Sequence, residues 1–186
     1  MKRKILNVMP ECYVDTNLIE YLLDGVVNHQ HCCSKVAGQL KNTFADKFAI
    51  GIIDKDKVEL GYIQACDEIA KTAHLTLLKH KSRHQYLITI SPAVDKFVLD
   101  SAKEQGVDTE KYNLPSTLRE FTKLSKSVTS NTDERFKNLF AAINGNSEFR
   151  ALKRTLEYLL GKQYNTDISE LTRIFGGEEQ ETNHPL

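Results

Sequence analysis

The sequence predicts an α/β protein in which a mostly parallel sheet is flanked by helices and followed by a helical C-terminal portion. Short apolar runs alternate with helix-like segments up to about residue 90, and helical spacing dominates after Ser91. The run FAIGII at 48–53 has no polar alternation, which is typical of a central strand covered on both faces. Strand–helix–strand alternation implies right-handed crossovers, and such crossovers join parallel strands.

The first half of the chain contains apolar runs that we interpret as strands, at 5–8, 26–29, 48–53, 75–78 and 86–90. A helix is predicted between the second and third strands because one apolar stripe recurs at helical spacing: Cys33, Val36, Ala37, Leu40 and Phe44. A shorter stripe predicts a helix between the first and second strands: Leu18, Tyr21 and Leu22.

The second half reads as a series of helices. Pro92 suits the first turn of a helix that runs to about Gln105, where Gly106 ends it. Further helices are expected to start at Ser116, at 132–133, at 146–147 and at Thr166, since each position offers a capping residue. Glycines are expected to end three of them: Gly145, Gly161 and Gly176. We therefore divide the chain into a sheet domain at 1–105, a helical portion packed on it at 106–176, and a polar tail at 177–186.

Composition limits the classes of function. The 25 lysine and arginine residues balance 25 aspartate and glutamate residues, so nucleic acid would be held by a local patch or a partner rather than by net charge. No run approaches the roughly 20 apolar residues of a membrane span, and no signal peptide precedes Pro10 and Glu11. The four cysteines fit no disulfide framework, which indicates a cytoplasmic protein. The chain has no glycine-rich phosphate loop, which argues against ATP or dinucleotide binding.

Two acids follow the strand at 48–53. Asp54 and Asp56 are two residues apart, so on an extended backbone their side chains point the same way. Ligands of parallel sheets bind at the carboxyl ends of the strands. Two neighbouring carboxylates repel each other unless a cation lies between them, and Mg²⁺ or Mn²⁺ suits such oxygen ligands. The alternative interpretation is a solvated acidic turn, neutralised by Lys55 and Lys57.

A third acid, Glu11, follows the apolar run ILNVM through Pro10, and therefore also lies near a strand end. With this ordering, the segments VMPECYVDTNLIEYLLDG and FAIGIIDKDK resemble the TOPRIM fold of topoisomerases, primases and overcoming-lysogenization-type nucleases. The resemblance covers about residues 5–90. It departs from the family pattern at Cys12, where the family has glycine, and at Pro10.

The TOPRIM resemblance implies a Rossmann-like sheet with a magnesium or manganese site. Glu11 would act as the acid/base or as a metal ligand, and Asp54 and Asp56 would be metal ligands. Asp15, four residues after Glu11, would be a weaker participant in the metal site. The metal would stabilise charge on a phosphoryl oxygen and activate water.

A second resemblance overlaps the first. The string CYVDTNLIEYLL is similar to the opening of a PIN-type ribonuclease, whose first strand ends in Asp-Thr-Asn. In that interpretation the strand is 12–14 and Asp15 leads the metal site, with Asp54 as a further acid. Both resemblances imply metal-dependent cleavage of a phosphodiester.

Two further segments carry residues suited to chemistry. The string HQHCC at 29–33 has zinc-ligand residue types, but zinc sites space paired ligands further apart. We expect His29 and His31 near the carboxylates, either in a substrate-facing loop or with a packing role and an exposed imidazole, and Cys32 and Cys33 at the start of the next helix. The basic cluster KHKSRH at 79–84 is either a solvated loop or a phosphate contact. We include Lys81 in the predicted site, as a source of transition-state charge stabilisation.

These observations lead to competing functional hypotheses. The first is a metal-dependent nuclease or related phosphodiester-processing protein that acts on DNA or RNA, in a bacterial defence or mobile-element system. The second is a catalytically degenerate TOPRIM-like subunit that binds a protein partner or a second copy of itself. In the third the acids are incidental and scattered.

Overall fold

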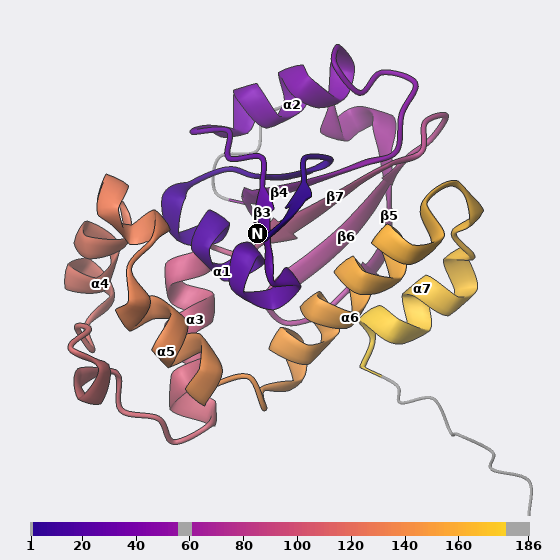
Figure 1. The fold of residues 1–186 in the computed structure, drawn as a ribbon. Coiled ribbons are helices and arrows are strands. Elements are labelled where there is room, and N and C mark those ends of the chain that lie inside the picture. The colour runs from indigo at the N-terminus through magenta and orange to yellow at the C-terminus, as the bar shows by residue number, and fades with distance from the viewer. Residues whose placement is uncertain (1, 56–60, 178–186) are drawn as a thin grey trace, which may run out of the picture.

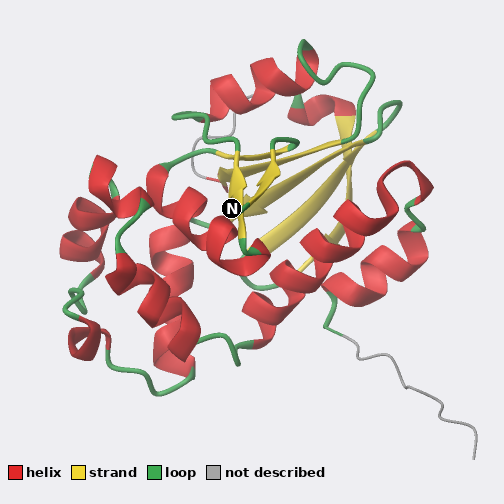
Figure 2. Cartoon of the chain, in the orientation of Figure 1, coloured by secondary structure: helices red, strands yellow, loops and turns green. Residues whose placement is uncertain are grey.

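A computed structural model describes residues 2–55 and 61–177, which form an α/β fold with sheet strands between layers of helices (Figures 1 and 2). The strands are β1 (Arg3–Ile5), β2 (Val8–Pro10), β3 (Gly25–Val27), β4 (Ala49–Asp54), β5 (Cys66–Lys71), β6 (Leu75–His80) and β7 (Gln85–Ile90). The helices are α1 (Tyr13–Leu23), α2 (Cys33–Lys41), α3 (Val94–Glu104), α4 (Leu118–Ser125), α5 (Glu134–Ala142), α6 (Ser147–Lys162) and α7 (Ile168–Phe175). Among the described residues, no helix has the length and apolarity needed to cross a membrane.

The main sheet is mixed, so the prediction of a mostly parallel sheet is wrong. Its five strands lie in the order β2-β4-β7-β6-β5, and only β2, β4 and β7 run parallel to one another. Strands β6 and β5 are antiparallel to their neighbours because short turns, at 72–74 and 81–84, join β5, β6 and β7. Such turns leave no room for the crossover that a parallel connection requires.

The N-terminal strand has a break that splits it between two partners. Its first part, β1, pairs with β3 in a two-stranded parallel sheet, and its second part, β2, pairs with β4. The chain after β3 continues beside β2, since the backbone N–H groups of Asn28 and Gln30 donate to the carbonyls of Val8 and Pro10 at 2.9 and 3.1 Å. The carboxyl ends of β3, β2 and β4 therefore lie next to one another.

The two faces of the main sheet are covered differently. Helix α2 covers one face, and α1, α3, α5 and α6 lie on the other (Figure 1). Along β4, Ile50 and Ile52 enter the core of the second face, whereas Ile53 packs on the α2 side. Gly51 also faces α2, and a β-carbon there would lie 2.8 Å from the Val36 side chain, so glycine permits the close approach of this helix.

The C-terminal helices share one apolar core with the sheet. Side chains of α3, α4, α5, α6 and α7 belong to one cluster with those of α1 and one face of the sheet, and in it Phe149 of α6 stacks on Phe97 of α3 with ring centroids 4.9 Å apart. Asp133 and Asn146, two of the predicted caps, accept hydrogen bonds from backbone N–H groups of the first turn, whereas Asp167 rather than the predicted Thr166 caps α7. Gly161, in contrast, does not end its helix, because α6 continues to Lys162.

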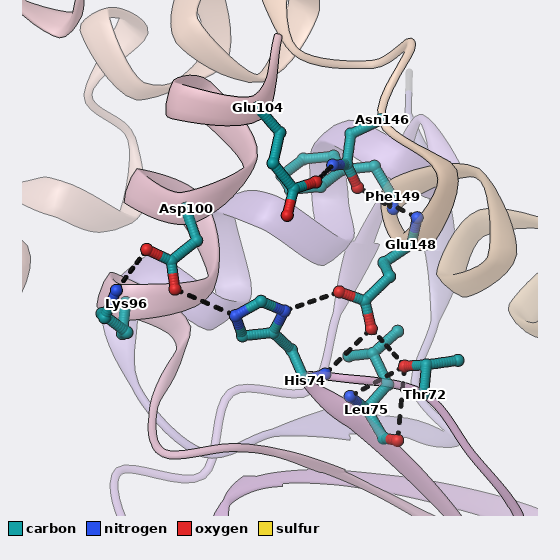
Figure 3. A network of polar contacts seen from close by, with 9 residues as sticks. All are labelled: Thr72, His74, Leu75, Lys96, Asp100, Glu104, Asn146, Glu148 and Phe149. Carbon is teal, nitrogen blue, oxygen red and sulfur yellow. Dashed lines mark hydrogen bonds and ion pairs between the residues drawn. The ribbon is translucent and has the colours of Figure 1, made fainter.

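A half-buried polar network ties the turn between β5 and β6 to α3 and α6 (Figure 3). The two ring nitrogens of His74 lie 2.6 Å from a Glu148 carboxylate oxygen and 3.0 Å from an Asp100 carboxylate oxygen. Ionised carboxylates only accept, so both ring nitrogens donate and the imidazole is protonated. Burial alone would lower the pKa of His74, but the hydrogen bonds to Glu148 and Asp100 outweigh burial and raise it.

This network is expected to make stability depend on pH. The folded protein keeps a proton on His74 that the unfolded chain releases near pH 6.5, so the contribution is complete below that pH and is lost as pH rises through the raised pKa. The unfolding free energy should therefore fall as the pH rises above about 6.5, the ordinary pKa of histidine. In urea denaturation, His74→Gln should show a smaller decline than the wild type. The exposed His84→Gln is the control, and equal declines in wild type and His74→Gln would contradict the assignment.

Candidate carboxylate site

The carboxyl end of the sheet, where β2, β4 and β7 end, brings two of the predicted acids together. Glu11 follows β2 and Asp54 ends β4, and both side chains are buried. The backbone N–H of Asp54 donates to Glu11 Oε2 at 3.2 Å. The Asp54 carboxylate in turn accepts from the backbone N–H of Val94 at 3.0 Å, at the N-terminus of α3. The positive end of a helix dipole thus faces this carboxylate.

Asp15 lies in the first turn of α1, close to the same two acids. One of its oxygens accepts from the backbone N–H of Cys12 at 3.1 Å, which caps the helix. The other oxygen, Oδ1, has no hydrogen-bond partner, and the residue is only 1% exposed. Burial raises the pKa of Asp15 well above its usual range, and the negative charges of Asp54 and Glu11 raise it further. We call Glu11, Asp15 and Asp54 the acid cluster.

A fourth acid, Asp95, lies in the first turn of α3, directly after Val94. It is 6% exposed and its Oδ1 also lacks a hydrogen-bond partner, while its neighbour Val94 binds Asp54 through the backbone. Asp95 is not part of the site predicted from the sequence, because an acid in the first turn of a helix is most simply explained by its interaction with the helix dipole. Its burial is the signal that sequence alone does not show.

Cys12 is the N-cap residue of α1. Burial raises the pKa of its thiol far above the usual range, and the charges of Asp15 and Asp54 add to this effect. The thiol therefore stays protonated and brings no further negative charge to the acid cluster.

The remaining predicted site residues lie elsewhere. Asp56 is outside the described residues. Lys81 lies in the turn that precedes β7, whereas Asp54 pairs with Ile90 at the other end of that strand. The prediction that Lys81 joins the acids is therefore wrong, because an antiparallel β6 carries it to the opposite end of the sheet. There its Nζ lies 3.7 Å from an Asp67 carboxylate oxygen.

The PIN-type alternative placed a strand at 12–14, and this placement is wrong, since Tyr13–Leu23 is helix α1. The segment at 29–33 does lie beyond β3, beside the end of β2, and Cys32 and Cys33 begin α2 as expected.

The acid cluster offers the donor set of a hard divalent cation. Its ligands are carboxylate oxygens, which Mg²⁺ and Mn²⁺ prefer. Asp15 Oδ1 is buried without a hydrogen-bond donor, so a cation would satisfy it and offset the repulsion among the three acids. Across residues 2–55 and 61–177, no three His, Cys, Asp or Glu side chains already converge on one point as metal ligands do.

Asp15→Asn is expected to stabilise the protein in the absence of divalent metal. Between the ordinary pKa of aspartate near 3.8 and the raised pKa of Asp15, the folded protein keeps a proton on Asp15 that the unfolded chain has released. The unfolding free energy therefore falls as the pH rises between these two pKa values. Asparagine removes this cost and still accepts from Cys12. With EDTA present, we expect a gain of about 1–3 kcal/mol that is larger at pH 7.5 than at pH 5. Urea denaturation measures it, and a variant less stable than wild type at both pH values contradicts it.

Other known proteins offer no second line of argument for this chain. Comparisons with protein-family models, with curated proteins and with solved structures found no match. A function can therefore be inferred only from the sequence pattern and the geometry of the site. Both place buried acids at the carboxyl ends of parallel strands.

Proposed function

We propose that this protein is a metal-dependent nuclease, or a related phosphodiester-processing protein, of TOPRIM-like type. The observation that carries the proposal is Asp15, a buried acid with an unpartnered oxygen, whose pKa is raised by burial and by the charges of Asp54 and Glu11. A protein gains nothing in stability from such repulsion, so the arrangement fits a site that binds a cation. The sequence resemblance to TOPRIM proteins names the same acids.

Within this proposal, each part of the site has a separate task. Glu11, Asp15 and Asp54 would hold Mg²⁺ or Mn²⁺, together with Asp56 as the sequence pattern implies. The metal would stabilise charge on a phosphoryl oxygen and activate water. The backbone N–H of Val94 fixes the Asp54 carboxylate, and the backbone N–H of Cys12 fixes Asp15, so the fold itself orients two of the ligands.

The balanced charge of the chain bears on how nucleic acid would be held. With 25 basic and 25 acidic residues, long-range attraction to DNA or RNA is weak. We therefore expect a protein partner or a second copy to supply part of the substrate-binding surface, as in a defence or mobile-element system.

A second candidate function is a degenerate TOPRIM-like subunit that binds a partner and does not cleave. Cys12 favours this alternative, because its side chain packs against the acids at the position where the family pattern has no side chain.

A cleavage assay separates the two functions. The protein is incubated with single- and double-stranded DNA and RNA in Mn²⁺, in Mg²⁺ and in EDTA. If the protein is a nuclease, we expect cleavage that requires the metal. Lys81→Ala should cleave as the wild type does, because Lys81 lies at the other end of the sheet. Metal binding without cleavage of any substrate favours the degenerate subunit, and cleavage that persists in EDTA contradicts both.

A further inference from the structure

Two histidines beyond β3 form a pair that the proposed metal site does not use. The Nε2 atom of His29 lies 3.0 Å from the Nδ1 atom of His31. Both rings contact the first turn of α1: Tyr13 stacks on His29 with ring centroids 4.6 Å apart and meets His31 edge-on at 5.8 Å. The other ring nitrogen of His29, Nδ1, lies 2.8 Å from the hydroxyl of Thr16.

The hydrogen bonds of Thr16 fix where the protons of this pair lie. The Thr16 hydroxyl donates to the Cys12 carbonyl at 2.8 Å, so it can only accept from His29 Nδ1–H. In a neutral imidazole the second nitrogen is then an acceptor, and His29 Nε2 must receive the Nδ1–H of His31. The lone pair of His31 is left on its outer nitrogen, Nε2, and His31 is exposed.

The surroundings keep the pair in this state. Burial lowers the pKa of His29, and a charge on His31 would lower it further, so His29 stays neutral. Tyr13 Oη lies 3.4 Å from His31 Nδ1, the same nitrogen that faces His29. His31 itself has a φ of +70°, a left-handed backbone conformation that residues with a β-carbon seldom adopt. The inner nitrogens are occupied by each other, which suits proton transfer better than chelation of a metal.

The pair lies beside the acid cluster. The backbone N–H of Gln30, between the two histidines, donates to the carbonyl of Pro10 at 3.1 Å, and Pro10 directly precedes Glu11. The helix that carries Tyr13 and Thr16 also carries Asp15. An exposed nitrogen lone pair is thus positioned at the same end of the sheet as the acids.

We propose that His31 Nε2 accepts the proton of the water that attacks a phosphodiester bound at this end of the sheet, with His29 and Thr16 as positioning residues. This inference rests on the proposed nuclease function. The water oxygen forms a bond to phosphorus while its proton moves to His31 Nε2, and the bond from phosphorus to the leaving oxygen breaks. The leaving oxygen takes a proton from solvent, and His31 later returns its proton to solvent. The products are a phosphomonoester and an alcohol, and Glu11 is left to serve the metal.

The test compares His31→Gln with His84→Gln, an exposed histidine at the opposite end of the sheet. Cleavage by His31→Gln should be about 10²–10⁴-fold slower, as for the loss of a general base, while Mn²⁺ binding stays unchanged. His84→Gln should cleave as the wild type does. If His31→Gln cleaves within about twofold of wild type while Asp54→Asn is inactive, the proposed function stands and this inference falls. A wild type that cleaves nothing overturns both.

A second variant separates a proton-transfer role from a structural one. His31→Gly suits the positive φ and leaves space for a free imidazole. Imidazole in the buffer should restore a measurable part of the rate in this variant and should not change the rate of Asp54→Asn. A slow His31→Gly variant without such recovery assigns His31 a structural role. Nitrogen-15 NMR of the wild type should show the Nδ1–H tautomer on both histidines, and an Nε2–H tautomer on His31 would overturn the proposed role of His31 as proton acceptor.

Discussion

Replacing Asp54 with asparagine is expected to reduce metal-dependent cleavage by roughly 10³-fold, the size of effect seen when one charge-stabilising group is removed from an active site. Asp54 lies at the end of the central strand β4, buried, with its carboxylate fixed by the backbone N–H of Val94. Asparagine keeps an oxygen that accepts from Val94, so the loop and α3 keep their places. The variant loses one negative charge of the acid cluster.

The matched control for Asp54→Asn is Asp67→Asn, which removes the same charge from β5. The Asp67 side chain is 68% exposed and lies near Lys81, at the opposite end of the sheet. This variant should cleave at the wild-type rate. Equal losses in the two variants would mean that net charge rather than the acid cluster governs activity, and full activity in Asp54→Asn would remove Asp54 from the site.

Phe149→Ala is expected to destabilise the fold by about 3–5 kcal/mol, a large share of the usual 5–15 kcal/mol. Phe149 is 1% exposed and stacks on Phe97, and its ring centroid lies 6.2 Å from that of Phe140. It therefore joins α6 to α3 and α5 within the core that also contains the sheet. Removing the ring leaves a cavity that these three helices cannot close without moving.

Urea denaturation measures the loss in Phe149→Ala, and Val128→Ala is the surface control. Val128 is 67% exposed, so its truncation should change stability by no more than about 0.5 kcal/mol. A loss below about 1 kcal/mol for Phe149→Ala would contradict the packing of α6 on α3.

The sequence predicted the fold well where local chemistry decides the structure. Strand β4 was predicted because a continuous apolar run marks a strand buried on both faces. The caps Asp133 and Asn146 were predicted because capping depends on a few neighbouring residues. Glu11 and Asp54 were expected together for a similar reason, since the carboxyl ends of adjacent parallel strands meet.

Features that depend on distant contacts were missed. Strand β5, with the sequence CDEIAK, is a half-exposed edge strand and shows no apolar alternation to mark it. The direction of β6 was misjudged because sequence spacing does not distinguish a crossover from two short turns. This error also misplaced Lys81. The hydrogen-bonded chain from Thr16 through His29 to His31 depends on side-chain positions that no sequence pattern encodes.

The central claim is that the acid cluster binds a divalent cation, and calorimetric titration with Mn²⁺ tests it most directly. Wild type and Asp54→Asn are titrated side by side, with Asp67→Asn as the charge control. We expect one saturable binding event in the wild type and in Asp67→Asn, and loss of that event in Asp54→Asn. No binding to the wild type, or equal binding to Asp54→Asn, would contradict it.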